Sequence, residues 1–195
     1  MALTTSCPIR IAVLGGGIAG CSFVHKLRQL ETRRIGDTAP GQVDTSGNEQ
    51  NHRFQISIFE MGRGPGGRAG TRLSRDLPGM RCDHGVPYFE PQSGRMMSLT
   101  QALVDAGHAA PFEGSFGELR QGPSGCCEFL PEDPSGGARR FRGSPGMNGI
   151  CEGLLSGGSP ALRLETRFGT MVTAMERTDD GGWRLLAKDG SSLGE

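Results

Sequence analysis

The stretch that decides the fold is Ile9–Gly20, IRIAVLGGGIAG. It opens with a short apolar run rich in β-branched side chains, which is typical of a buried parallel strand. Glycines end that run abruptly, and between Ile18 and Leu30 the apolar residues recur with the period of a helix. The stretch therefore predicts a strand at Ile9–Leu14, a glycine turn and a helix at Ile18–Leu30.

A second strand is predicted at Phe54–Phe59, FQISIF, from its alternation and its β-propensity. Residues 31–52, between the helix and this strand, are polar and without periodicity, and they predict a long solvated loop. Strand, helix and strand in this order form a right-handed βαβ unit. The predicted fold class is therefore α/β, with a Rossmann-like βαβ domain.

The residues Gly15–Gly20 have the pattern G-x-G-x-x-G between the predicted strand and helix, which is typical of a dinucleotide site. Gly15 allows a tight turn, Gly17 lets the backbone approach a pyrophosphate, and Gly20 lets the helix pack closely on the sheet. The N–H groups at the start of the helix then bind the phosphate charge. A nucleotide-hydrolase phosphate loop is excluded, because Cys21 stands where that loop needs lysine.

Glu60 follows the second predicted strand, where an acidic residue accepts hydrogen bonds from a ribose hydroxyl. It lies further from the glycines than the usual spacing of about 20 residues. The polar insertion accounts for the excess, because a loop lengthens at small entropic cost. The alternative is a solvated carboxylate at the end of a strand.

A second glycine stretch, Arg63–Arg72 (RGPGGRAGTR), comes directly after Glu60. A nicotinamide dehydrogenase needs no such stretch here, whereas the longer FAD runs past this loop. Gly66 and Gly67 permit close backbone approach, and Arg68 can pair with a phosphate through a charge-assisted fork. The predicted cofactor is FAD, and the alternative is a basic glycine-rich loop that binds nothing.

Residues 15–20 and 59–72 together resemble FAD proteins of the glutathione-reductase type of fold, and within them the renalase-like branch of the flavin amine oxidases. The resemblance covers nearly the whole chain apart from the 31–52 insertion. Three further stretches agree with that branch: Cys82–Phe89 (CDHGVPYF), Phe141–Asn148 (FRGSPGMN) and Val172–Trp183. In the first of these stretches the family's usual sequence is DHGAQYF, from which Val86 and Pro87 depart.

The resemblance implies an FAD-binding site made of residues at the family's motif positions, with the backbone at Val172 touching the adenine. The implied cofactor-binding residues are Gly15, Gly17, Ile18, Ala19, Gly20, Glu60, Met61, Gly67, Arg68, Arg72 and Val172. It also implies that Asp83–Gly85 and Pro145–Asn148 lie towards the flavin or the start of the substrate region. His84 is interpreted as a structural histidine rather than a proton shuttle. No catalytic residue and no metal ligand is assigned.

The implied activity is that of an FAD-dependent oxidoreductase that takes hydride from a small amine or a dihydronicotinamide-type substrate, with NAD(P)H among the candidates. Proteins of this family are longer than 195 residues, so the chain is expected to be a fragment or a truncated form. A catalytically incompetent FAD-binding remnant is therefore one alternative. An NAD(P)-dependent dehydrogenase is the other, and the second glycine stretch disfavours it.

The domain organisation follows from these motifs. Residues 1–85 are expected to form the N-terminal part of the FAD-binding domain, 86–160 part of an α+β substrate domain, and 161–195 a return to the first domain. Further predicted elements are helices at Met96–Ala106 and Asn148–Leu155, short antiparallel strands within Phe112–Phe141, a hairpin that pairs Thr170–Arg177 with Trp183–Ala187, and one more strand at the end of the sequence.

Charge and composition exclude several classes of partner. The formal net charge is zero with both signs interspersed, so no nucleic-acid partner is expected. No run approaches the roughly 20 apolar residues of a membrane span. The 6 cysteines show no zinc-type spacing and are interpreted as reduced thiols. An intracellular, cytoplasmic location is expected, and an organellar location remains an alternative.

Overall fold

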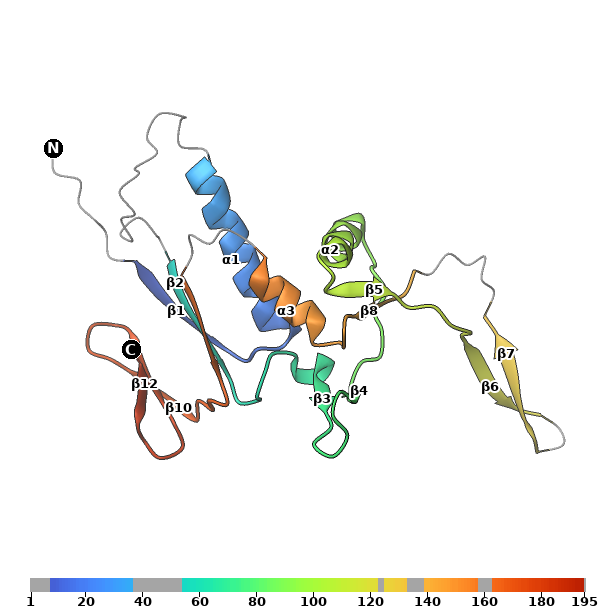
Figure 1. Ribbon diagram of the computed structural model, residues 1–195. Coiled ribbons are helices and arrows are strands. Elements are labelled where there is room, and N and C mark those ends of the chain that lie inside the picture. The colour runs from blue at the N-terminus through green and yellow to red at the C-terminus, as the bar shows by residue number, and fades with distance from the viewer. Residues whose placement is uncertain (1–7, 37–53, 123–124, 133–138, 158–162, 195) are drawn as a thin grey trace.

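The computed structural model describes residues 8–36, 54–122, 125–132, 139–157 and 163–194. The fold is built on a parallel sheet of three strands, in the order β1 (Ile9–Leu14), β2 (Phe54–Glu60) and β9 (Arg163–Phe168). Helix α1 (Ile18–Gly36) connects β1 to β2 (Figure 1). This arrangement is a Rossmann-like α/β fold, which confirms the predicted fold class.

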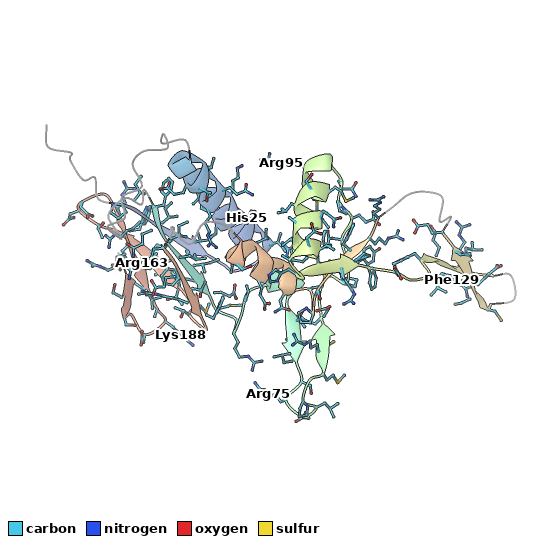
Figure 2. All side chains as sticks on the ribbon, turned by 45° about the horizontal axis from the view of Figure 1, so that its top comes forward. His25, Arg75, Arg95, Phe129, Arg163 and Lys188 are labelled. Carbon is cyan, nitrogen blue, oxygen red and sulfur yellow. The ribbon has the colours of Figure 1, made fainter. Side chains whose placement is uncertain are left out.

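The hydrophobic core lies where the sheet meets α1 and the later helix α3 (Gly149–Ser156). Ile56 and Ile58 of β2 are fully buried there, together with Val24 of α1 and Leu154 of α3. Polar contacts hold the two helices together as well. Nδ1 of His25, which lies on α1 beside α3 in Figure 2, is 3.2 Å from the Leu154 carbonyl oxygen.

Helix α1 is longer than the sequence pattern suggests. It continues to Gly36, so the prediction that a loop begins at residue 31 is wrong. Glu31 is buried, and the hydroxyl of Thr32 donates a hydrogen bond to the carbonyl of Arg28 within the helix. Residues 31–35 (ETRRI) contain no helix breaker. The prediction failed because these residues are polar, whereas the helix continues through them and buries the carboxylate of Glu31. The rest of the predicted loop, 37–52, lies outside the described residues.

Strand β9 is a member of the sheet that the sequence pattern does not reveal. It pairs in parallel with β2, with Gln55 opposite Arg163 and Glu60 opposite Phe168. Its sequence, RLETRF, has the polar alternation of an edge strand rather than the apolar run of a buried one. Residues 163–168 therefore lie at the edge of the same sheet as the glycine-rich turn.

The predicted C-terminal hairpin is confirmed with a shorter first strand. Strand β10 (Ala174–Arg177) pairs antiparallel with β11 (Trp183–Leu186), and the segment 170–173 precedes the strand instead of belonging to it. The expected additional strand is β12 (Ser192–Gly194), which pairs with β11.

The elements from α2 (Gly94–Asp105) to β8 (Phe141–Gly143) lie on the far side of α3 from the sheet, and β3 and β4 lie below α3 in the view of Figure 1. The predicted helix at Met96–Ala106 is confirmed as α2, and the antiparallel strands expected within 112–141 include the pair β6–β7. The predicted helix at Asn148–Leu155 is confirmed as α3. The elements of this region are η2 (Gly67–Ala69), β3 (Thr71–Leu73), β4 (Arg81–Asp83), α2 (Gly94–Asp105), β5 (Ala109–Pro111), β6 (Gly117–Gln121), β7 (Cys127–Pro131) and β8 (Phe141–Gly143).

Candidate dinucleotide-binding site

The glycine-rich turn lies at the carboxyl end of β1. Gly15 has a φ of +102°, a backbone conformation that side chains other than glycine's strongly disfavour. Its N–H donates a 2.8 Å hydrogen bond to the carbonyl of Phe59, which fixes the turn against the end of β2. Ligands of open α/β sheets bind at this edge, outside the carboxyl ends of the strands.

Gly20 is required by packing. A Cβ at this position would lie 2.1 Å from the carbonyl oxygen of Gly15, which is far inside van der Waals contact. The first turn of α1 can therefore approach the end of β1 only because residue 20 has no side chain.

Gly17 is different, because the described chain itself does not require glycine there. Its φ lies outside the left-handed region, and an added Cβ would meet nothing closer than the Gly66 carbonyl oxygen at 3.9 Å. The missing side chain leaves open space at the start of α1. The first N–H groups of a helix have no acceptor within the helix, so this space adjoins backbone donors that suit an anion.

The second glycine stretch docks directly on the first. The N–H of Gly66 donates a 2.8 Å hydrogen bond to the carbonyl of Gly16, and Gly17 and Gly66 form a parallel bridge. Gly67 has a φ of +55°, and a Cβ on it would lie 3.4 Å from the Cα of Gly17. The two stretches, distant in sequence, thus form one backbone surface beside the start of α1.

The carboxylate of Glu60 connects the first glycine stretch to the residues just before the second. One oxygen, Oε2, accepts a 2.7 Å hydrogen bond from the N–H of Gly16, and Oε1 accepts one of 2.6 Å from the N–H of Gly62. The sequence pointed to a ribose partner for Glu60 and not to these backbone donors. Each carboxylate oxygen has two acceptor positions, so a ribose hydroxyl can bind in addition to the backbone.

Among the predicted side-chain contacts, Arg68, Arg72 and Met61 are exposed. No group in the described part of the chain pairs with the Arg68 guanidinium, which leaves a cation available beside the glycine turn. The backbone of Arg68 has a structural role, because its carbonyl accepts a 3.1 Å hydrogen bond from the N–H of Val86. A Cβ on Gly85 would lie 1.9 Å from that carbonyl oxygen, so the 83–86 segment lies tightly against η2.

Val172 lies next to the same edge of the sheet. The N–H of Thr170 donates to the carbonyl of Glu60 at 2.9 Å, and the N–H of Gly169 donates to that of Gly62 at 2.8 Å. Val172, which is half-buried, follows Thr170 by two residues, so these bonds hold it close to the segment 60–62. An open hollow of about 630 Å³ beside it is lined by Gly169, Thr170, Met171, Ala187, Lys188, Asp189 and Leu193. None of the glycine-motif residues lines this hollow, so it is not the phosphate site.

The stretches 82–89 and 141–148 meet through a polar clamp that consists of Thr71, Asp83 and the backbone at residues 147–148. Oδ1 of Asp83 accepts hydrogen bonds from the Thr71 hydroxyl and from the N–H of Met147, the latter at 3.0 Å. The Thr71 oxygen accepts from the N–H of Asn148 at 3.2 Å. The clamp fixes the start of α3 against β3 and β4. Sequence reasoning missed Thr71, because a threonine in a short strand gives no signal of a distant partner.

A dinucleotide fits the residues present at this edge. The open space at Gly17 and the helix N-terminus match a pyrophosphate, Arg68 offers a cation, and Glu60 offers acceptors for a ribose. Within the described ranges, no group of His, Cys, Asp and Glu side chains is arranged to hold a metal ion. The described helices include none that is both long enough and apolar enough to cross a membrane.

Comparison with known proteins agrees with this fold. A family model described as "NAD(P)-binding Rossmann-like domain" matches residues 13–103. A comparison with curated protein sequences found no match.

Several solved structures are similar in part. They include the Diels-Alderase PyrE3 of pyrroindomycin biosynthesis, at 14% identity, a TM-score of 0.49, and coverage of 94% of this chain and 30% of that one. PqsL, a probable FAD-dependent monooxygenase from Pseudomonas aeruginosa, has 14% identity, a TM-score of 0.45 and coverage of 95% and 40%. A 2-methyl-3-hydroxypyridine-5-carboxylic acid oxygenase has 14% identity, a TM-score of 0.48 and coverage of 96% and 37%. The chain thus spans between 30% and 40% of the length of these proteins.

The sheet order and the crossover helix show a Rossmann-like α/β fold, and residues 13–103 are similar to the family model described as an NAD(P)-binding Rossmann-like domain.

Proposed function

We propose that the chain binds FAD across the carboxyl ends of β1, β2 and β9 and serves an FAD-dependent oxidoreductase. The observation that carries the proposal is the contact between the two glycine stretches, where Gly66 donates to Gly16 and bridges Gly17. That contact extends the backbone surface from the start of α1 towards η2 and β3. A nicotinamide dinucleotide needs only the first part of this surface, whereas the longer flavin dinucleotide uses both.

The proposed roles of the chain's residues follow from their positions. The N–H groups of Ile18–Gly20 and the guanidinium of Arg68 neutralise the pyrophosphate, with the open side of Gly17 giving access. Glu60, held by Gly16 and Gly62, presents acceptors to the adenosine ribose. FAD, when bound, supplies the hydride acceptor, and the protein's part is to bind and orient it.

A finer proposal concerns the branch of flavoproteins. The motifs at 82–89 and 141–148 favour a renalase-like enzyme that acts on a small amine or a dihydronicotinamide. Its support in the structure is the clamp, in which Asp83 contacts Thr71 of β3 and the backbone of Met147. The clamp connects the second glycine stretch to the segment expected near the flavin. We assign no catalytic residue.

The cofactor proposal is tested by purifying the chain, measuring its visible absorption, and identifying any released cofactor by chromatography. Titration with FAD and separately with NADH and NADPH then compares affinities, because the matching family model is described as NAD(P)-binding. Stoichiometric FAD supports the proposal. Selective binding of NADH or NADPH would favour a nicotinamide dehydrogenase instead, and a folded protein that takes up neither would reject both.

The sharpest variant for this test is Gly17→Ala. Because its Cβ would meet nothing closer than 3.9 Å, the variant should fold normally while its methyl group blocks the pyrophosphate. The matched control is Gly94→Ala at the start of α2, where an added Cβ also meets open space. We expect Gly17→Ala to lose FAD and Gly94→Ala to keep it, at equal thermal stability.

The activity proposal needs a separate test. Anaerobic mixing of the FAD-loaded protein with small amines, NADH, NADPH and their isomers should bleach the visible absorption if one of them reduces the flavin. FAD binding without bleaching by any of these reductants would favour the catalytically incompetent alternative for this chain.

A further inference from the structure

Two buried cysteines lie directly behind the glycine turn. Cys21 belongs to the first turn of α1, immediately after Gly20, and Cys151 belongs to α3. Both side chains are 0% exposed and both belong to the core where the two helices pack. The other described cysteines, Cys82, Cys126 and Cys127, are exposed.

The two thiols are connected to each other and to the turn. Cys21 lies one turn before His25 on α1, and Cys151 lies one turn before Leu154 and Leu155 on α3. His25 and Arg28 contact the carbonyls of Leu154 and Leu155, so the packing of the two helices brings Cys21 and Cys151 into the same part of the core. The Cys21 thiol is 3.3 Å from the carbonyl oxygen of Gly16 and donates to it. That same carbonyl accepts from the N–H of Gly66 at 2.8 Å, where the two glycine stretches meet. A chemical change at Cys21 therefore acts on the backbone atom that joins both stretches.

The surroundings of the two sulfurs shift their pKa values in opposite directions. The hydrogen bond from Cys151 lowers the pKa of Cys21, against the opposing effects of burial and of the charge of Glu60. The same hydrogen bond, with burial, raises the pKa of Cys151. The position of Cys21 at a helix N-terminus also favours its thiolate. Because Cys21 lies in the first turn of α1, it is assigned as the nucleophile of the pair, and Cys151 on the packed helix α3 as the residue that resolves its oxidation product.

We propose that Cys21 and Cys151 form a reversible dithiol–disulfide pair, oxidised by hydrogen peroxide, that weakens dinucleotide binding when the disulfide forms. The Cys21 thiolate attacks one peroxide oxygen, the O–O bond breaks, and the sulfur becomes a sulfenic acid with release of hydroxide. The Cys151 sulfur then attacks the Cys21 sulfur, forming the S–S bond. Its proton and the departing hydroxide leave as water. In total two thiols and one peroxide give one disulfide and two waters.

The effect on the turn follows from the loss of a donor. In the disulfide Cys21 has no S–H, so the carbonyl of Gly16 loses one of its hydrogen bonds while the first turn of α1 is tied to α3. Peroxide reaches the buried sulfurs through local opening of the contact between α1 and α3. The effect on binding rests on the proposed function, whereas disulfide formation does not.

The chemical part is tested on a variant in which Cys7, Cys82, Cys126 and Cys127 are replaced by serine. After peroxide treatment and alkylation under denaturing conditions, peptide mass spectrometry should find residues 21 and 151 in one cross-linked peptide that dithiothreitol separates. The same mapping on the unsubstituted chain serves if the variant does not fold. Recovery of both cysteines as free, alkylated thiols, while Cys82, Cys126 and Cys127 of the unsubstituted chain are oxidised, overturns the proposal.

Two single variants test which cysteine is oxidised first. In Cys151→Ser a sulfenic acid should accumulate at Cys21 and be trapped by dimedone. In Cys21→Ser the remaining thiol of Cys151 should stay unlabelled. Labelling at Cys151 and none at Cys21 would reverse the assigned roles and contradict the proposal.

The effect on binding is measured by FAD titration of the reduced, oxidised and re-reduced protein. We expect oxidation to raise the Kd about tenfold, within the usual range for coupled sites, and dithiothreitol to restore it. A disulfide with unchanged Kd overturns the coupling. A reduced protein that does not bind FAD contradicts the proposed function and not the disulfide, which the mass measurement decides by itself.

Discussion

At the scale of single residues, the glycines of the site fall into distinct physical classes. Gly15 is needed for its backbone conformation, Gly20 for packing, and Gly17 for neither within the described chain. One motif thus combines positions that build the fold with a position that leaves space for a ligand. Substitutions at Gly17 and Gly20 should therefore have opposite signatures.

Gly20→Ala should destabilise the fold itself. Its Cβ would overlap the carbonyl oxygen of Gly15 at 2.1 Å. That oxygen belongs to the backbone of the turn, which cannot move away without separating α1 from β1. We expect a loss of about 1–3 kcal/mol in the free energy of unfolding, as for other overpacked sites. Urea denaturation followed by circular dichroism measures it, with Gly94→Ala as the control. Unchanged stability would show that the turn adjusts freely.

Glu60→Gln should affect both stability and binding. A glutamine has a single side-chain acceptor, so one of the N–H groups of Gly16 and Gly62 would face an amide donor. We expect a loss of about 1–3 kcal/mol in unfolding free energy, together with weaker FAD binding. The matched control is Glu118→Gln on β6, whose ion pair with Arg120 is exposed and should contribute no more than about 1 kcal/mol. Equal stability of the two variants would contradict a structural role for Glu60.

At the scale of elements, the clamp between β3, β4 and the start of α3 should contribute measurably to stability. Thr71→Val keeps the shape of the side chain and removes the hydroxyl that donates to Asp83 and accepts from Asn148. We expect a loss of about 1–3 kcal/mol, because the remaining polar groups lose a partner. Thr71→Ser, which keeps the hydroxyl, should restore most of it. Equal loss in both variants would assign the effect to packing instead of hydrogen bonding.

The elements that the sequence predicts are those with local signals. The strand before Gly15, the helix after it and the strand before Glu60 follow from periodicity and glycine placement. Strand β9 was missed because it pairs with β2, which is far away in sequence, and because its own alternation resembles that of any exposed strand. The backbone partners of Glu60 were missed for a similar reason, since N–H groups of a folded turn leave no trace in the order of side chains.

At the scale of the whole molecule, stability should be unevenly distributed. The sheet and α1 lie at one side and the β6–β7 pair at the other, with Phe129 near that far end (Figure 2). Ile56 and Ile58 of β2 are fully buried, whereas every residue of β6 is exposed, including Leu119 at 74%. A two-stranded ribbon without a buried face is only marginally stable by itself.

Amide hydrogen exchange should therefore separate the two ends of the molecule. The amides of β2 hydrogen-bond within the sheet beneath α1, and we expect them to exchange only through global unfolding. Those of β6 and β7 should exchange through local opening, at least about a hundredfold faster. Peptide-resolved exchange with mass spectrometry measures both, and addition of FAD should slow exchange around the glycine turn while leaving β6–β7 unchanged. Equal protection of β2 and β6–β7 would mean that the ribbon unfolds together with the sheet, and protection of the ribbon by FAD would place it in contact with the cofactor.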